Sequence, residues 1–192
     1  MPSINQAALD FLLSRRSRPA KTLVAPAPTR AQLAPILTAA ARSPDHGKLE
    51  PWRFIVIESG AMARLADLTE ARGTALGKST EDITKGRSQF DLGHLAVAVI
   101  EVQQAVEKVP PIEQSYSAGA VCLALLNAAL ASGWGANWLS GWVSHDRDFC
   151  QQGLGLEDNE RIAGFIHIAT EGTRPPERPR PDLDAKTEWV KK

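Results

Sequence analysis

The stretch SAGAVCLALLNAALAS, residues 117–132, decides the fold. It lies within the longest apolar element of the chain, residues 112–132, and it is apolar on nearly all sides, which is typical of a helix buried in a core. The small residues at 118–120 favour close approach of another helix, within the subunit or across a dimer axis. Together with Asn127 they argue against a membrane span. We therefore expect a buried central helix on which a sheet packs.

Three segments read as strands. Residues 52–57, WRFIVI, and 161–170, RIAGFIHIAT, are rich in β-branched and aromatic residues, whereas residues 95–102, LAVAVIEV, form the short apolar run of a buried central strand. Residues 133–141 break the central helix and predict a short strand that runs into a glycine turn. Because strands and long helices alternate without a strict βαβ rhythm, the sequence predicts an α+β fold with one sheet.

Apolar residues at helical spacing predict further helices, at 4–14, 29–40, 61–76 and 144–154. Thr29 and Ser144 are the expected N-caps of the second and the last of these. Residues 79–91 are polar and without clear periodicity, so a short helix and a mobile lid over a pocket both remain open. The proline- and charge-rich residues 174–192 are expected to be disordered or to form an extended arm on a partner subunit.

The composition fits one globular domain over residues 1–192, with 43% hydrophobic and 23% charged residues. Lys and Arg number 22, as do Asp and Glu, so the formal net charge is zero and nothing favours nucleic acid as a partner. The N-terminus lacks the order of a signal peptide, and no apolar run reaches the roughly 18 residues of a membrane span. We therefore expect a soluble cytoplasmic protein.

Several familiar kinds of site lack their sequence patterns. Cys122 and Cys150 show neither metal-ligand spacing nor a disulfide framework, which fits a reducing compartment, and the histidines also lack paired spacing. No G-x-S-x-G nucleophile elbow is present. The glycine-containing stretches 133–138 and 153–158 lack the strand and helix context of a dinucleotide fingerprint. The sequence thus predicts no metal centre, no hydrolase triad and no Rossmann site.

Two stretches concentrate polar side chains at helix ends. SRRSR, residues 14–18, offers guanidinium forks and hydroxyls that suit a phosphate dianion, although the same arginines could simply complement the helix dipole. RSPDHGKLEPWRF, residues 42–54, joins a helix to a strand. Within it, Arg42 and His46 could hold a hydroxyl, a phosphate or a ring carbonyl, and an ordinary surface turn is the alternative.

Taken in order along the chain, these motifs resemble the FMN-dependent nitroreductase family, most closely its short bacterial branch of NAD(P)H nitroreductases. The resemblance rests on Arg15-Arg16-Ser17, Arg42-Ser-Pro-Asp-His46 with Glu50-Pro-Trp-Arg-Phe54, Ser117-Ala-Gly119 and Gly133-x-Gly-x-x-Trp138-x-Ser-Gly141. It implies a nitroreductase-like α+β fold with a mainly antiparallel central sheet. It also implies a homodimer with two FMN sites at the subunit interface and ping-pong electron transfer from NAD(P)H.

The same resemblance implies cofactor-binding residues and no catalytic side chain. The implied residues are Arg15, Arg16, Ser17, Arg42, His46, Trp138, Leu139 and Ser140. The first three fall on the segment that holds the FMN phosphate and part of the ring system, and the last three on the stretch that lines the flavin. Arg42 falls on a further contact from the same subunit and His46 on one from the other subunit. Residues 128–133 match a region associated with the nicotinamide nucleotide.

The chain departs from the family pattern at three places. Family members often carry Lys or Arg where this chain has Pro19, and Arg18 and Lys21 are the candidates to replace that contact. Gly93-His94 stands where an Ala-Pro is usual, and Ala169-Thr170-Glu171 where a Gly-Thr-Pro is common. These departures leave FMN as the expected cofactor and bear on the flavin potential and the acceptor.

The sequence therefore predicts an FMN-dependent oxidoreductase that takes hydride from NAD(P)H and reduces a nitroaromatic, a quinone or a related acceptor. A flavin-binding or flavin-carrying protein without efficient NAD(P)H turnover is the alternative, motivated by Pro19. A helical dimerisation module without a cofactor is the third hypothesis. The choice between NADH and NADPH stays open, since no ribose-reading residue can be located.

Overall fold

The computed structural model describes residues 3–191, and its centre is one five-stranded sheet whose strand pairs in this range are all antiparallel. The strands run in the order β1-β5-β3-β2, and β4 pairs with β5 as well. Their bounds are β1 (Leu23–Val24), β2 (Trp52–Glu58), β3 (Leu95–Val102), β4 (Gly135–Leu139) and β5 (Glu160–Glu171).

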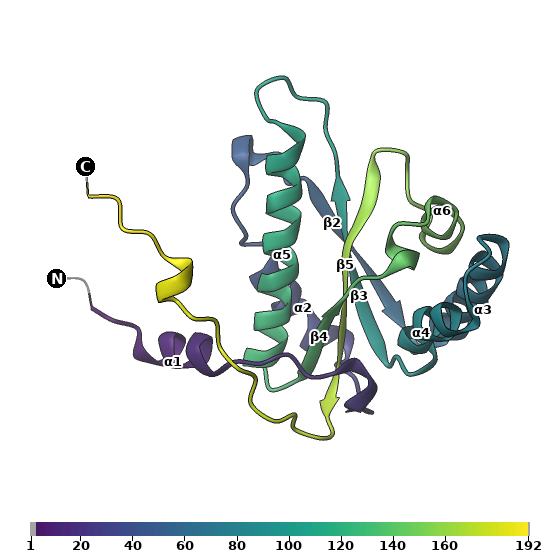
Figure 1. Ribbon diagram of the computed structural model, residues 1–192, viewed down its shortest axis with the longest axis horizontal. Helices are drawn as coiled ribbons and strands as arrows, with labels where there is room; N and C mark the ends of the chain where they lie inside the picture. Colours follow the sequence, from purple (N-terminus) through teal and green to yellow (C-terminus); the bar gives the residue numbers. More distant parts are fainter. Residues whose placement is uncertain (1–2, 192) are drawn as a thin grey trace.

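The described range contains six α-helices; five of them pack on this sheet, and α1 lies apart from it (Figure 1). They are α1 (Gln6–Ser14), α2 (Arg30–Ala40), α3 (Ser59–Ala75), α4 (Thr80–Asp91), α5 (Pro111–Ala131) and α6 (Arg147–Leu154). Short 3-10 turns occupy Ala20–Thr22, His46–Lys48, Trp142–Ser144 and Asp184–Lys186. The predicted α+β fold with an antiparallel sheet and a long buried helix is confirmed.

The sheet carries a separate apolar core on each face. Helices α2 and α5 cover one face, and α3, α4 and α6 cover the other (Figure 1). Strand β3 supplies both cores because its side chains alternate: Val97 and Val99 face α5, whereas Ala96, Ala98 and Ile100 face the opposite side. This double burial explains the nearly continuous apolar run of β3, which the sequence identified as a central strand.

Helix α5 is the core helix of the α5 face. Pro111 opens it, where a missing N–H costs no helical hydrogen bond, and Gly133 at φ +85° follows its C-cap. By length and composition α5 could cross a membrane, but its buried residues, among them Val121 and Leu125, pack into the core of the sheet. Since these side chains already contact the sheet, α5 serves here as a core element.

Two local predictions need revision. Residues 79–91, left open as helix or lid, form α4, with the Ser79 hydroxyl accepting from the backbone N–H of Asp82. The prediction that Ser144 caps the next helix is wrong. Ser144 ends a 3-10 turn, and the carboxylate of Asp146 caps α6 by accepting from the Phe149 N–H at 3.0 Å. Asp146 is the cap because its carboxylate also accepts two hydrogen bonds from the Arg72 guanidinium, which hold it in place.

His167 is a buried histidine within the sheet. It lies on β5 between Ala96 of β3 and Asn137 of β4, its exposed fraction is 2%, and its Nε2 has no hydrogen-bond partner among the described residues. Burial lowers the pKa of His167 to about 4. The unfolded chain therefore takes up this proton near pH 6.5, whereas the folded chain resists it until about pH 4.

This difference predicts acid sensitivity well above the range in which carboxylates titrate. Between pH 7 and pH 4.5 the unfolded state binds more protons, so the free energy of unfolding should fall by roughly 2 to 3 kcal/mol. Urea denaturation at the two pH values measures this change. His167→Gln should flatten the dependence, while His145→Gln, at an exposed position, should keep it. Equal pH dependence in the parent and His167→Gln proteins would show that another group is responsible.

Candidate functional site

The arginine-rich segment after α1 lies along strand β4. The backbone N–H of Arg18 donates to the Ala136 carbonyl at 2.8 Å, and the Asn137 side chain donates back to the Arg18 carbonyl at 2.8 Å. Arg18 also lies 2.7 Å from the Glu171 carboxylate of β5. These contacts hold residues 15–18 against strands β4 and β5. They bring together two sequence motifs that were expected to share a ligand, Arg15-Arg16-Ser17 and the stretch 133–141 that contains Trp138, Leu139 and Ser140.

Positive charge accumulates at this segment. Burial, together with the nearby charges of Arg180 and Arg18, lowers the pKa of Arg15. Arg15 Nε and Arg16 Nη1 are buried, and in the part of the chain that the structure describes they have no hydrogen-bond partner. Arg15 does donate to the Ser17 hydroxyl, at 3.1 Å. Half-buried arginines with unused donors and like-charged neighbours make a site for an anion.

Arg180 is the member of this group that the sequence did not reveal. It belongs to the predicted C-terminal arm and pairs with Glu177 at 2.8 Å. The sequence shows the arginines of the tail but contains no periodic or motif signal that the tail returns toward Arg15. Only the folded chain places the two charges close enough to influence one another.

A cavity of about 470 Å³ is lined in part by the residues that directly follow the arginine segment. Its walls are the turn after the arginines, the end of β4 with the residues that follow, and one side of α4. The lining residues are Pro19, Ala20, Lys21, Asp82, Lys85, Gly86, Ser88, Gln89, Leu92, Asn137, Leu139, Ser140, Gly141 and Trp142. Two of the three residues expected to line a flavin, Leu139 and Ser140, therefore border this cavity.

Trp138 lies differently from its two neighbours. It pairs with Ile166, which belongs to the α5 core, so its side chain is on the α5 face of the sheet. There the indole covers Gly164, and a Cβ at that glycine would fall 2.0 Å from the indole Nε1. Side chains alternate along β4, so those of Asn137 and Leu139 lie on the cavity side of the sheet. Trp138 contributes only its backbone to that side.

Helix α4 forms a firmly packed wall of the cavity. The Arg87 guanidinium binds the carboxylates of Asp67, Glu70 and Asp91 and so ties α4 to α3. Trp142 packs on α4 and donates from its indole Nε1 to the Asp82 carbonyl at 3.2 Å. This position explains why residues 79–91 are polar and aperiodic: α4 buries few side chains, and its polar residues face solvent and the cavity.

Gly86 should be essential to this wall. A Cβ there would lie 2.7 Å from the Trp142 indole Nε1, so Gly86→Ala must displace the ring. We expect a net loss of about 1 to 2 kcal/mol in unfolding free energy, since overpacking outweighs the better helix propensity of alanine. Urea denaturation measures it. Gly60→Ala in α3 is the matched control, because a Cβ there meets no atom within 4 Å and should be neutral or stabilising. A neutral Gly86→Ala would refute this packing.

Arg42 and His46 lie at the other end of α5. The Ser117 hydroxyl donates to the Pro44 carbonyl at 2.9 Å, whereas the Arg15 segment is beside Ala136, beyond the C-terminus of α5. From Ser117 to the end of α5 the helix rises by about 20 Å. Within one chain the structure therefore does not bring Arg42 and His46 together with Arg15–Ser17. Both residues are exposed, and Figure 1 shows the 3-10 turn His46–Lys48 beside α5.

The region assigned by resemblance to the nicotinamide nucleotide borders a second, smaller cavity. This cavity measures about 380 Å³ and is lined by Gln32, Pro35, Ser132, Gly133, Trp134 and Thr170.

Among residues 3–191, no group of three or more His, Cys, Asp or Glu side chains could hold a metal ion. Cys122 and Cys150 are buried free thiols whose pKa values are raised by burial to about 12 and about 11.

Comparisons with known proteins identify the family of this chain. A model described as "Nitroreductase family" matches residues 12–170. The Escherichia coli (strain K12) protein named "Putative NAD(P)H nitroreductase YdjA" is 36% identical over 163 residues, covering 85% of this chain and 87% of that protein.

Solved structures show the same fold. The nitroreductase-like family protein from Bacillus cereus has a TM-score of 0.80 at 20% identity, covering 100% of this chain and 99% of that chain. A variant of the FMN and NADPH-dependent nitroreductase NfnB from Sphigopyxis sp. strain HMH has a TM-score of 0.75 at 17% identity, covering 96% and 99%. The match over most of the chain, in family model and in relative, shows that this protein belongs to the nitroreductase family.

Proposed function

We propose that this chain is an FMN-dependent oxidoreductase that takes hydride from NAD(P)H and reduces nitroaromatic, quinone or related acceptors by a ping-pong mechanism. The observation that carries the proposal is that the segment with the anion site, Arg15 to Arg18, leads directly into Pro19–Lys21, which line a cavity together with Leu139 and Ser140. The names of the relatives support it, since one is called an NAD(P)H nitroreductase and another is described as FMN and NADPH-dependent.

The residues at the anion site fit the phosphate end of FMN. A phosphate dianion would use the unpartnered Arg15 Nε and Arg16 Nη1 and would relieve the repulsion between Arg15 and its cationic neighbours. The Ser17 hydroxyl, already bonded to Arg15, would add a neutral donor beside it. Arg180 would bring the C-terminal arm into the site.

The cavity fits the ring end. Leu139 supplies an apolar wall, Ser140 a hydroxyl, and Lys21 and Lys85 the positive charge; neither lysine forms an ion pair within the described range. When bound, FMN supplies redox chemistry that no amino-acid side chain has. These cations beside the cavity would stabilise charge that develops there on reduction, and no side chain is assigned as general acid or base.

A homodimer is part of the proposal because two apolar surfaces lack cover in one chain. No residue of α1 is buried, and Leu9, Leu12 and Leu13 are exposed on it. On α5 the exposed residues Tyr116 and Leu123 follow one face of the helix. In Figure 1, α1 and the C-terminal arm extend away from the body beyond α5. Uncovered apolar helices of this kind mark interaction surfaces, and a second copy is the partner we propose.

The dimer would also complete the site. Arg42 and His46 lie about 20 Å along α5 from the arginine segment of their own chain. A second copy packed on the exposed face of α5 could bring its Arg42 and His46 to the first chain's cavity. In this arrangement Arg42 would come from the second copy, which revises the expectation that it acts within its own subunit, and His46 would reach across as expected.

A flavin-binding protein without efficient NAD(P)H turnover is the alternative, and Pro19 is the observation that favours it. Pro19 lines the cavity and has no side-chain donor, where family members often carry a cation. Lys21, two residues further on, and Lys85, across the cavity, are the available replacements.

We also propose a cytoplasmic location, since a reducing compartment suits the two buried thiols.

An anaerobic absorbance spectrum before and after addition of NADH or NADPH tests the reductase. The purified protein, reconstituted with FMN where necessary, should show flavin bands that bleach with at least one nucleotide. Bands that persist with both nucleotides would favour the flavin-binding alternative. A protein that stays colourless after reconstitution would contradict both and support a dimerisation module without a cofactor.

A further inference from the structure

The loop that carries His46 is exposed and yet held in a costly conformation. Gly47, Lys48 and Glu50 have φ values of +75°, +56° and +47°, and two of these residues are not glycine. Left-handed backbone at residues with a Cβ costs free energy and persists only where surrounding contacts fix it. Contacts with the rest of the chain must therefore hold this loop in its left-handed conformation.

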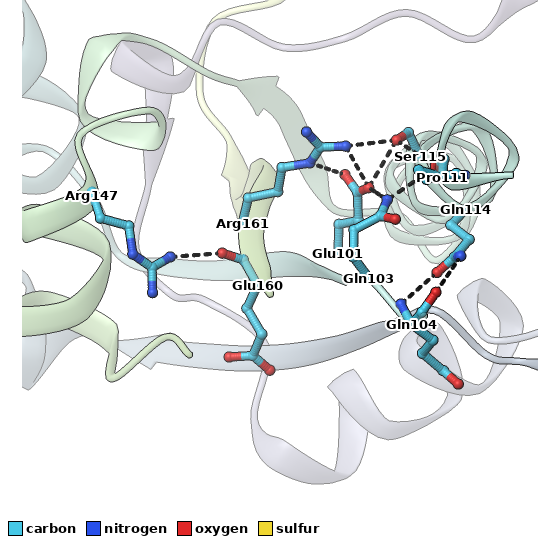
Figure 2. Close-up of polar contacts among 9 residues, drawn as sticks. All are labelled: Glu101, Gln103, Gln104, Pro111, Gln114, Ser115, Arg147, Glu160 and Arg161. Atoms are coloured by element: carbon cyan, nitrogen blue, oxygen red, sulfur yellow. Dashed lines mark hydrogen bonds and ion pairs between the residues drawn. The ribbon is translucent and has the colours of Figure 1, made fainter. Parts of the chain in front are cut away.

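Those contacts come from α5 and from the connection that precedes it. Gln104 donates from its side chain to the Leu49 carbonyl at 2.7 Å. Gln104 is in turn fixed by the buried Gln114 of α5, which accepts from the Gln104 N–H and donates to its carbonyl, as Figure 2 shows. The Ser117 hydroxyl, also on α5, donates to the Pro44 carbonyl. The loop is therefore attached to α5 at both of its ends.

His46 makes its own contact with α5. Its Nδ1 lies 2.6 Å from Oε2 of Glu113, in the first turn of the helix. An ionised carboxylate only accepts hydrogen bonds, so Nδ1 must carry the proton and donate. The bond fixes the ring orientation and the tautomer, and it leaves Nε2 uncommitted on a side chain that is 55% exposed. The loop is held by contacts with α5, and the imidazole ring is held by Glu113. Nε2 of His46 is therefore in a defined position from which it can contact a ligand.

We propose that Glu113 is a positioning residue that orients His46 toward the cofactor site of a second copy of this chain. The inference rests on the proposed function, because it requires FMN at the shared site. Glu113 itself would touch neither cofactor nor substrate. It would act through His46 by holding the Nδ1–H tautomer, so that Nε2 meets the cofactor ready to accept a hydrogen bond, or to donate one when the ring is protonated.

A double-mutant cycle on FMN affinity tests whether Glu113 acts through His46. Glu113→Ala should weaken FMN binding to the apoprotein about three- to tenfold, the range for one lost hydrogen bond. Glu113→Gln should largely restore the affinity, because its amide oxygen still accepts from Nδ1. In a His46→Ala background, Glu113→Ala should have no further effect. Glu107→Gln, which removes an exposed acid from the connection before α5, is the matched control and should bind as the parent does.

Nitrogen NMR of histidine-labelled apoprotein gives a second readout that needs no cofactor. His46 should carry its proton on Nδ1 in the parent protein and lose that preference in Glu113→Ala. Unchanged tautomers, an FMN affinity within twofold of the parent, or additive effects in the double mutant would each overturn the inference. If the parent protein failed to bind FMN at all, the proposed function would fail instead, while the tautomer measurement would still report on the His46–Glu113 pair.

Discussion

Replacing Arg15 by alanine should weaken FMN binding by about 1.5 to 3 kcal/mol, the range for a lost charge-assisted contact. Arg15 has a buried Nε that finds no hydrogen-bond partner among residues 3–191, and it lies near two further cations, Arg18 and Arg180. A bound phosphate would satisfy the donor and offset the repulsion, so its affinity should depend strongly on this side chain. Quenching of FMN fluorescence on titration with apoprotein measures the change.

The stability of the apoprotein separates this role from a purely structural one. Arg15 is the C-cap residue of α1, where a cation could simply complement the helix dipole. If that were its role, Arg15→Ala would destabilise the chain and leave FMN affinity unchanged. If it holds the phosphate, the apoprotein should be at least as stable as the parent, because the substitution removes repulsion. Arg30→Ala, at an exposed position at the start of α2, serves as the control.

Leu123→Asp should separate the dimer and release the cofactor with it. Leu123 is 45% exposed on the free face of α5, where we place the second copy. A carboxylate buried there without a partner should cost about 3 kcal/mol or more, which raises the dimer dissociation constant at least a hundredfold. Sedimentation velocity at micromolar concentration should then show a monomer, and the flavin absorbance should no longer sediment with the protein.

A matched substitution on the other side of the sheet guards against a general effect of added charge. Leu76, at the end of α3, is 49% exposed. Leu76→Asp should therefore remain a flavin-bound dimer, and circular dichroism should show both variants folded. A Leu123→Asp protein that stayed dimeric with stoichiometric flavin would place the interface elsewhere and would remove the argument for a site shared across α5.

The main elements could be predicted from the sequence because their burial is reflected in their residues. Helix α5 and strand β3 are covered on most sides, so both read as nearly continuous apolar runs. Thr29 caps α2 as predicted, and the structure adds a capping box with Gln32. Strand β1, only Leu23–Val24, was missed because two residues carry no periodicity and pair only because β5 extends past them. Helix α4 was left open for a similar reason, since its only buried residues are Gly86 and Phe90.

The candidate site was predicted in parts. The motifs at residues 15–17 and 138–140 identified two segments that the fold does bring together, but the strand alternation that turns Trp138 to the α5 face required the register with β5. Arg180 and α4 could not be placed from sequence, because their proximity to the site depends on long-range folding. The wrong cap at Ser144 shows the same limit, since an ion pair from distant Arg72 favours Asp146.

Sedimentation of the apoprotein titrated with FMN tests most directly whether two copies of this chain hold FMN at a shared site. Absorbance at protein and flavin wavelengths, followed in one run, reports the mass of each species and the flavin that it carries. The account predicts that flavin sediments only with the dimer and saturates at one FMN per chain. Flavin that sediments with a monomer, or a dimer that takes up no flavin at saturating FMN, would contradict it.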